Sequence, residues 1–196
     1  MNILLSTALE VIAASVFLIP VFFALDRYRF KNSKRTILYF VFSLYFCAVY
    51  AVVGLPNITY IRFDPHFNFT PFAYMFSDLR STILNVILFL PLGFFLPILW
   101  KKYRSIGASV LFGFCMSLLI EVLQLFTYRA TDINDLMTNT LGTILGYLLG
   151  ILTLKLIPSL TPSDQSKEEF YVCGAAFCVM FLAQPFLSAI MWKLLY

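Results

Sequence analysis

Charge is scarce in this sequence. Only 12% of its 196 residues are Asp, Glu, Lys or Arg, whereas soluble globular domains carry about 25% charged residues. Hydrophobic residues make up 61% of the chain and aromatic residues 18%, against about 45–50% apolar residues in soluble domains. This balance excludes a soluble globular domain, a disordered tail and a collagen-like fibre. It is typical of a chain whose solvent is lipid.

The sequence also has little of the chemistry on which many enzymes and metalloproteins depend. His66 is its one histidine, and its four cysteines lie inside apolar runs without forming a Cys-x-x-Cys pair. Soft-metal and redox sites are therefore not indicated. A Gly-x-Ser-x-Gly nucleophile elbow is absent, which argues against hydrolysis through a covalent intermediate. The net charge of +4 does not indicate nucleic-acid binding.

Long apolar runs dominate what is present. A membrane-spanning helix uses about 20 residues, so the sequence predicts an all-α, polytopic transmembrane bundle of about six spans. We expect a single membrane domain over residues 1–196. The predicted spans cover residues 3–25, 37–55, 83–99, 106–126, 136–157 and 170–192.

The placement of charge predicts the orientation of these spans. Five basic residues stand between the first two runs, and Lys101, Lys102 and Arg104 stand between the third and the fourth. Because short basic loops stay in the cytoplasm, we expect both termini outside, together with the connections 57–80 and 128–135.

The outer connection 57–80 is rich in aromatic residues. Amphipathic rings are favoured at the level of the lipid headgroups, so we expect an outer aromatic loop or short interfacial helix that forms a lid. Its aromatic residues are Tyr60, Phe63, Phe67, Phe69, Phe72, Tyr74 and Phe76.

A few polar side chains interrupt the apolar runs, and each needs a reason because burial in hydrocarbon is costly. Glu121 lies near the outer end of the fourth run, and Gln124 shares its helix face. Asp132, Asp135 and Asn139 share one face at the outer end of the fifth run. The two faces predict a polar cluster near the outer surface.

Glycines continue the face of the fifth helix towards the cytoplasm. Gly142, Gly146 and Gly150 form a small-xxx-small pattern that lets another helix approach closely. We expect the fourth helix to pack there, although the stripe would also serve a contact between two copies in a homodimer. Such packing gathers the polar side chains in one pocket, with Arg129 on the connecting turn. The third helix adds Arg80 and Asn85.

The chemistry of this pocket is limited to carboxylates, amides and guanidinium groups. Glu121, Asp132 and Asp135 are candidate catalytic residues for acid–base work. The candidate binding residues are Arg129, Asn85, Gln124, Asn139 and Arg80. No cofactor is predicted, although the oxygen ligands suit a hard divalent cation such as Mg²⁺ or Ca²⁺. Alternatively, the aspartates cap the fifth helix and the amides hold helices together.

Four short patterns occur in order: Asn-Phe-Thr-Pro-Phe at 68–72, Asn85 with Phe-Leu-Pro-Leu-Gly-Phe at 89–94, Glu-x-x-Gln from Glu121, and Arg-x-x-Asp-x-x-Asp-x-x-x-Asn from Arg129. Together they resemble the signature of the VanZ-like family of bacterial membrane proteins, over about residues 68–150.

The resemblance implies the plasma membrane of a bacterium and a link to resistance against teicoplanin. Teicoplanin is an acylated glycopeptide antibiotic that acts on peptidoglycan precursors at the outer leaflet, the side on which charge placement puts the pocket. We therefore expect the pocket to bind or modify an amphiphilic envelope molecule, either a lipid-linked wall precursor or a lipoglycopeptide, besides contacts with membrane lipid. A small transporter, or a structural or partner-binding protein without chemistry of its own, is the alternative.

Overall fold

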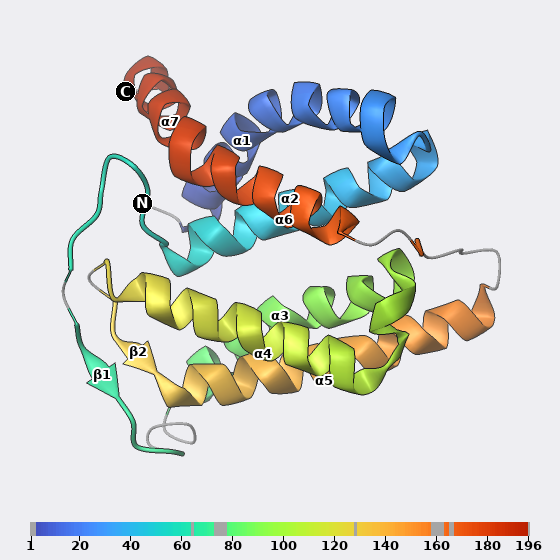
Figure 1. The fold of residues 1–196 in the computed structure, drawn as a ribbon. Helices are drawn as coiled ribbons and strands as arrows, with labels where there is room; N and C mark the ends of the chain where they lie inside the picture. Colours follow the sequence, from blue (N-terminus) through green and yellow to red (C-terminus); the bar gives the residue numbers. More distant parts are fainter. Residues whose placement is uncertain are drawn as a thin grey trace. The chain divides into compact units, whose positions relative to one another are not determined.

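A computed structural model of the chain describes residues 3–63, 65–72, 78–127, 129–157, 163–164 and 167–195. The described chain is almost wholly helical (Figure 1), which confirms the predicted all-α class. Six helical stretches are long and apolar enough to cross a membrane. Two short strands, β1 (Phe67–Asn68) and β2 (Thr131–Asp132), form a parallel pair.

The helices begin at polar capping residues. Asn32, Asp78 and Asp132 each accept a hydrogen bond from a backbone N–H of the first turn that follows. These three helices therefore begin a few residues before the first apolar residue from which their spans were predicted. The helical elements are α1 (Ile3–Leu25), η1 (Asp26–Phe30), α2 (Ser33–Val53), α3 (Leu79–Leu99), η2 (Lys101–Arg104), α4 (Ile106–Gln124), α5 (Ile133–Leu156), α6 (Glu168–Cys178), η3 (Val179–Ala183) and α7 (Gln184–Leu195).

The last predicted span is not one regular helix. Its α-helical turns widen in the π-helical segment η3, which joins α6 to α7. Pro185 lacks the N–H that would bond to the Phe181 carbonyl in a regular helix. The backbone N–H of Ile58 donates to that carbonyl instead, at 3.0 Å. The proline thus accounts for a site where a distant segment docks on the helix.

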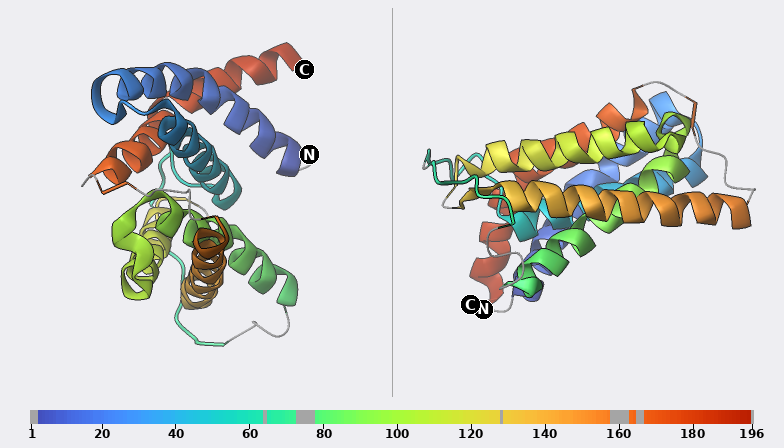
Figure 2. Two further views of the ribbon diagram at one scale, coloured as in Figure 1. Left: turned by 90° about the vertical axis from the view of Figure 1, so that its right-hand side faces the viewer. Right: turned by 90° about the horizontal axis from the view of Figure 1, so that it is seen from below.

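The contacts divide the chain into two compact units, residues 1–61 with 166–196 and residues 62–165. In the first unit α2 packs on α1 and α6, and α1 also packs on α7. Figure 2 shows α1 and α2 as a hairpin joined through η1. The expectation of a single membrane domain stays a prediction.

A buried polar contact joins α2 to α6 in the first unit. The Tyr39 hydroxyl donates to the Glu168 carboxylate at 2.6 Å, and Arg35 forms an ion pair with the same carboxylate at 3.9 Å. Tyr39 is fully buried and Glu168 is 6% exposed. A buried carboxylate that loses a donor retains its desolvation cost, so this contact matters for stability.

We expect Tyr39→Phe to lower the free energy of unfolding by about 1–3 kcal/mol, because Glu168 would stay buried with one donor fewer. Denaturant unfolding of the purified protein in detergent measures the change. Tyr28→Phe is the matched control, since Tyr28 is 77% exposed and should leave stability unchanged. Equal stability of the two variants would show that the hydroxyl contributes nothing.

The second unit is built from α3, α4 and α5. α5 packs on both of the other helices, and Figures 1 and 2 show α4 and α5 running side by side. The prediction that the glycine stripe of α5 packs on α4 is wrong. Gly142, Gly146 and Gly150 instead face the backbone of α3, where an added Cβ atom would lie under 3.0 Å from carbonyl oxygens or other backbone atoms.

The glycines of α5 face α3 because α3 also carries a small residue at the contact. A Cβ atom on Gly93, within the Pro-Leu-Gly segment of α3, would clash with the Thr143 carbonyl of α5. Small residues on both helices therefore let the two backbones meet, as small-xxx-small faces do in membranes. α4 approaches α5 through Gly113, which lies against the Thr143 side chain. The three helices consequently bring their polar ends together.

Candidate functional site

A buried carboxylate stands where α4 ends and α5 begins. Glu121 lies in the last turn of α4 and is 2% exposed. Its Oε2 atom accepts a hydrogen bond from the Asp132 backbone N–H at 2.9 Å, and its carbonyl accepts one from the Thr131 hydroxyl at 3.0 Å. The carboxylate therefore lies at the amino end of α5, where the helix dipole favours negative charge.

Asp132 performs the capping role that its position predicts. Its Oδ1 atom accepts hydrogen bonds from the backbone and side-chain N–H groups of Asn134, at 2.8 and 2.9 Å. Its Oδ2 atom accepts one from the Asn68 side chain at 2.9 Å. Asp132 is half-buried. It thus ties the start of α5 to a segment 64 residues earlier in the chain.

The described part of the connection 57–80, called the outer segment after its predicted side, is held against α5 by its backbone as well. In the parallel pair, Phe67 of β1 lies opposite Thr131 of β2, and the Thr131 N–H donates to the His66 carbonyl at 2.8 Å. Asn134 accepts from the Phe72 N–H at 2.7 Å and donates to the Thr70 carbonyl at 3.2 Å. We name the set Asn68, Thr70, Phe72, Asp132 and Asn134 the outer clasp, after the outer side on which the sequence predicts the connection 57–80.

Two further amides connect α5 to its neighbours. The Asn85 side chain of α3 donates to the Asp135 carboxylate at 2.6 Å. One turn deeper, Asn139 donates to the Ser117 hydroxyl of α4 at 2.9 Å. Asn139 is 4% exposed, and within the described part of the chain its Oδ1 atom has no hydrogen-bond partner. The predicted polar residues of α5 therefore face both α3 and α4.

The three carboxylates lie within electrostatic range of one another: Glu121 interacts with Asp132 and Asp135, and Asp135 interacts with Arg129. Gln124 is buried on α4, three residues after Glu121. The cluster thus holds three carboxyl groups near one basic side chain.

The two arginines that the sequence predicts for the site are both exposed. Arg129 is exposed on the turn between α4 and β2. Arg80 is exposed in the first turn of α3, and none of the described contacts joins its side chain to the cluster. Of the predicted site residues, hydrogen bonds therefore pair Glu121 with Asp132 and Asn85 with Asp135, whereas Asn139 bonds to Ser117. None of the described contacts brings Arg80 to them.

Sequence reasoning missed Asn134 and did not count Asn68 as a site residue. Asn134 follows Asp132 by two residues, the spacing at which an Asx side chain bonds to the backbone, so that signal was available. Asn68 belongs to the first of the four short patterns. Its pairing with Asp132 depends on a two-residue strand, which is too short for hydrophobic periodicity to predict.

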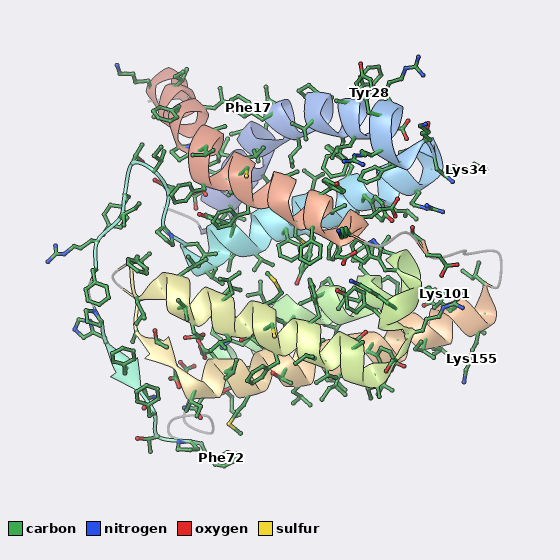
Figure 3. The ribbon with its side chains drawn as sticks, viewed as in Figure 1. Phe17, Tyr28, Lys34, Phe72, Lys101 and Lys155 are labelled. Atoms are coloured by element: carbon green, nitrogen blue, oxygen red, sulfur yellow. The ribbon has the colours of Figure 1, made fainter. Side chains whose placement is uncertain are left out.

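The described part of the outer segment carries exposed aromatic side chains. Phe67 and Phe69 stack with their ring centroids 5.3 Å apart, and both are more than half exposed. Phe72 lies at the far end of the described stretch (Figure 3) and is also exposed. The expected loop form agrees with the irregular chain here, while Tyr74 and Phe76 lie outside the described residues.

A cation site is not evident from the side chains alone. No group of three or more His, Cys, Asp or Glu side chains that could hold a metal ion occurs among the residues that the structure describes. The hard divalent cation therefore stays a prediction.

Comparison with known proteins places the chain in a family. The profile of the VanZ/LLP1 family matches residues 11–155, so the chain belongs to this family. Protein VanZ of Enterococcus faecium is 40% identical over 85 residues, which are 42% of this chain and 50% of that protein. The chain thus spans about half the length of this curated relative. No solved structure matches the chain.

Proposed function

We propose that this VanZ/LLP1 member binds the polar head of an amphiphilic cell-envelope molecule at the outer surface of a bacterial plasma membrane. The observation that carries the proposal is the assembly of Glu121, Asp132, Asp135, Asn85 and Asn68 at one end of the second unit, from four separate segments. Ionisable groups in apolar helices are candidates for a functional site, since their burial is costly.

The chemistry of the cluster suits a ligand rich in hydroxyl and amide groups. Asp132, Asp135 and Asn85 are half-buried and so remain in reach of a ligand. Glu121 is buried and accepts a hydrogen bond from the Asp132 backbone N–H. Carboxylates accept from hydroxyls and amides, and Arg129 can donate to carbonyl or anionic oxygens. These groups match the sugar and peptide part of a lipid-linked wall precursor or a lipoglycopeptide.

The apolar part of such a ligand would meet the aromatic outer segment. Phe67 and Phe69, which flank Asn68 of the outer clasp, and Phe72, which belongs to the clasp, are all exposed. Aromatic rings bury a large apolar area and favour the headgroup level of a bilayer. A polar cluster next to exposed rings is the pattern expected for an amphiphile. Protection against teicoplanin, which the family resemblance implies, would follow if the ligand is the drug or its target.

A structural role is the second candidate. The hydrogen bonds of the cluster are made largely within the chain, as Asp132 with Asn68 and Asp135 with Asn85 illustrate. Interhelical amide bonds of this kind hold membrane helices together. Under this alternative the ligand is absent, and substitutions in the cluster act through folding alone.

The test is susceptibility to teicoplanin and to vancomycin in a sensitive Gram-positive host that expresses the wild type or Glu121→Gln at matched membrane levels. A glutamine keeps an oxygen that can accept from the Asp132 N–H, so the variant should fold while losing the charge. We expect the wild type to protect against teicoplanin and Glu121→Gln to return the inhibitory concentration to that of the empty host.

Glu10→Gln is the matched control, because Glu10 is an acid inside α1 to which neither the sequence nor the described contacts assign a role. Its protection should equal that of the wild type. If well-expressed Glu121→Gln still protects, the proposal is wrong.

The same variant separates binding from catalysis. If Glu121 is a general acid or base, Glu121→Gln abolishes turnover of a purified wall precursor while the precursor still binds. Flux of substrate or protons into reconstituted vesicles would instead support the transporter alternative. A fall in folding yield alone would support the structural role.

A further inference from the structure

A second candidate site lies in the first unit, between α1 and α2. An open groove of about 400 Å³ lies between these helices, a volume within the range of small-molecule sites, about 300–1,000 Å³. Ile19, Phe23 and Ile37 line its wall and are all more than half exposed. The groove is therefore an apolar channel that is open along the helix surface rather than a closed core cavity.

One end of the groove is polar and tightly organised. Asp26, Ser33 and Thr36 line this end. The Asp26 carboxylate accepts hydrogen bonds from the Ser33 hydroxyl at 2.9 Å, the Thr36 hydroxyl at 2.7 Å and the Asn32 backbone N–H at 3.2 Å. These hydrogen bonds hold the carboxylate against the turn between η1 and α2.

Basic residues share the turn with this polar end, although none of them lines the groove, whose one charged lining residue is Asp26. Of the five basic residues in the segment 26–35, Arg29 lies 5.1 Å from the Tyr171 ring centroid and Arg35 pairs with Glu168. Arg27, Lys31 and Lys34 are exposed, and Figure 3 shows Lys34 at this turn. Clusters of four to eight basic residues just beyond the cytoplasmic end of a span are typical of anionic-lipid binding.

We propose that this groove binds an anionic phospholipid of the cytoplasmic leaflet. One acyl chain lies along the apolar wall that Phe23 and Ile37 provide, and the phosphate is neutralised by Arg27 and Lys34. The charge placement that predicts this turn on the cytoplasmic side also puts it at the level of the lipid headgroups. The site does not depend on the function proposed for the polar cluster of the second unit.

Native mass spectrometry of the purified full chain, released from a neutral detergent after incubation with phosphatidylglycerol or phosphatidylcholine, tests the headgroup. We expect phosphatidylglycerol to be retained in preference to phosphatidylcholine, and Lys34→Gln to lower its apparent affinity about fivefold. Lys155→Gln, which removes a basic residue at the cytoplasmic end of α5 (Figure 3), should leave the affinity unchanged. Equal retention of the two lipids, or an equal loss in both variants, would overturn the proposal.

A second pair of variants tests the groove without changing charge. Ile37→Trp places a bulky ring in the groove and should lower retention of phosphatidylglycerol, whereas Leu38→Trp alters a neighbouring exposed position that does not line it. Unchanged retention in Ile37→Trp would show that the lipid binds elsewhere on the protein.

Discussion

Gly146→Ala is expected to destabilise the second unit more than the same change at Gly142 or Gly150, the other two glycines of the α5 stripe. A Cβ atom at this position would lie under 3.0 Å from the Leu90 carbonyl and the Phe94 N–H of α3. Both are backbone atoms of a helix, so the clash cannot be relieved by a side-chain rotation. Overpacking a tight contact costs about 1–3 kcal/mol and sometimes more.

The measurement is unfolding of the purified protein in detergent, followed by circular dichroism and by the fraction that stays monodisperse. Gly174→Ala is the matched control, because a Cβ atom there meets nothing within 4 Å. Alanine is a better helix former than glycine by about 0.5–1 kcal/mol, so the control should be as stable as the wild type or more stable.

The three glycines of the stripe should also differ in how much stability is lost when each is replaced by alanine. The clash is closest at Gly146, intermediate at Gly142 and least close at Gly150. Losses of stability should fall in that order. If Gly146→Ala and Gly174→Ala unfold alike, α3 and α5 do not pack as described.

The helices could be predicted from the sequence because each apolar run is long enough to be unambiguous. Their starts were less predictable, since Asn32, Asp78 and Asp132 begin helices through side-chain capping rather than through hydrophobicity. The partner of the glycine stripe was mistaken for a related reason. The pattern shows that a helix approaches closely, but the identity of that helix depends on Gly93 and on the backbone of α3.

Much of the polar cluster was also predictable, because ionisable residues in apolar runs stand out. Glu121, Asp132 and Asp135 lie at the end of α4 and the start of α5, where the sequence predicts a polar cluster. The outer clasp was not predictable from periodicity, since two-residue strands carry no pattern and Asn68 pairs with Asp132 across 64 residues. Helix spacing places residues along one element, and it says little about contacts that a loop makes.

The outer clasp allows the structural role of Asp132 to be separated from the role of its charge. Asp132→Asn can keep an oxygen for the Asn134 N–H, but its amide nitrogen would then face the Asn68 side-chain donor. We expect a loss of about 1–3 kcal/mol in stability, faster proteolysis of the outer segment, and loss of teicoplanin protection.

Combining Asp132→Asn with Asn68→Asp exchanges donor and acceptor across the same hydrogen bond. The aspartate at 68 can still accept from the Thr70 N–H, as Asn68 does at 3.2 Å, so stability and protease resistance should recover. Protection should not recover, because the carboxylate has moved away from the capping position on α5, beside Glu121. Asn57→Asp, which adds the same charge at another Asx turn, controls for the new negative charge. Recovery of both stability and protection would show that Asp132 only holds the clasp together, and the cluster would then be structural.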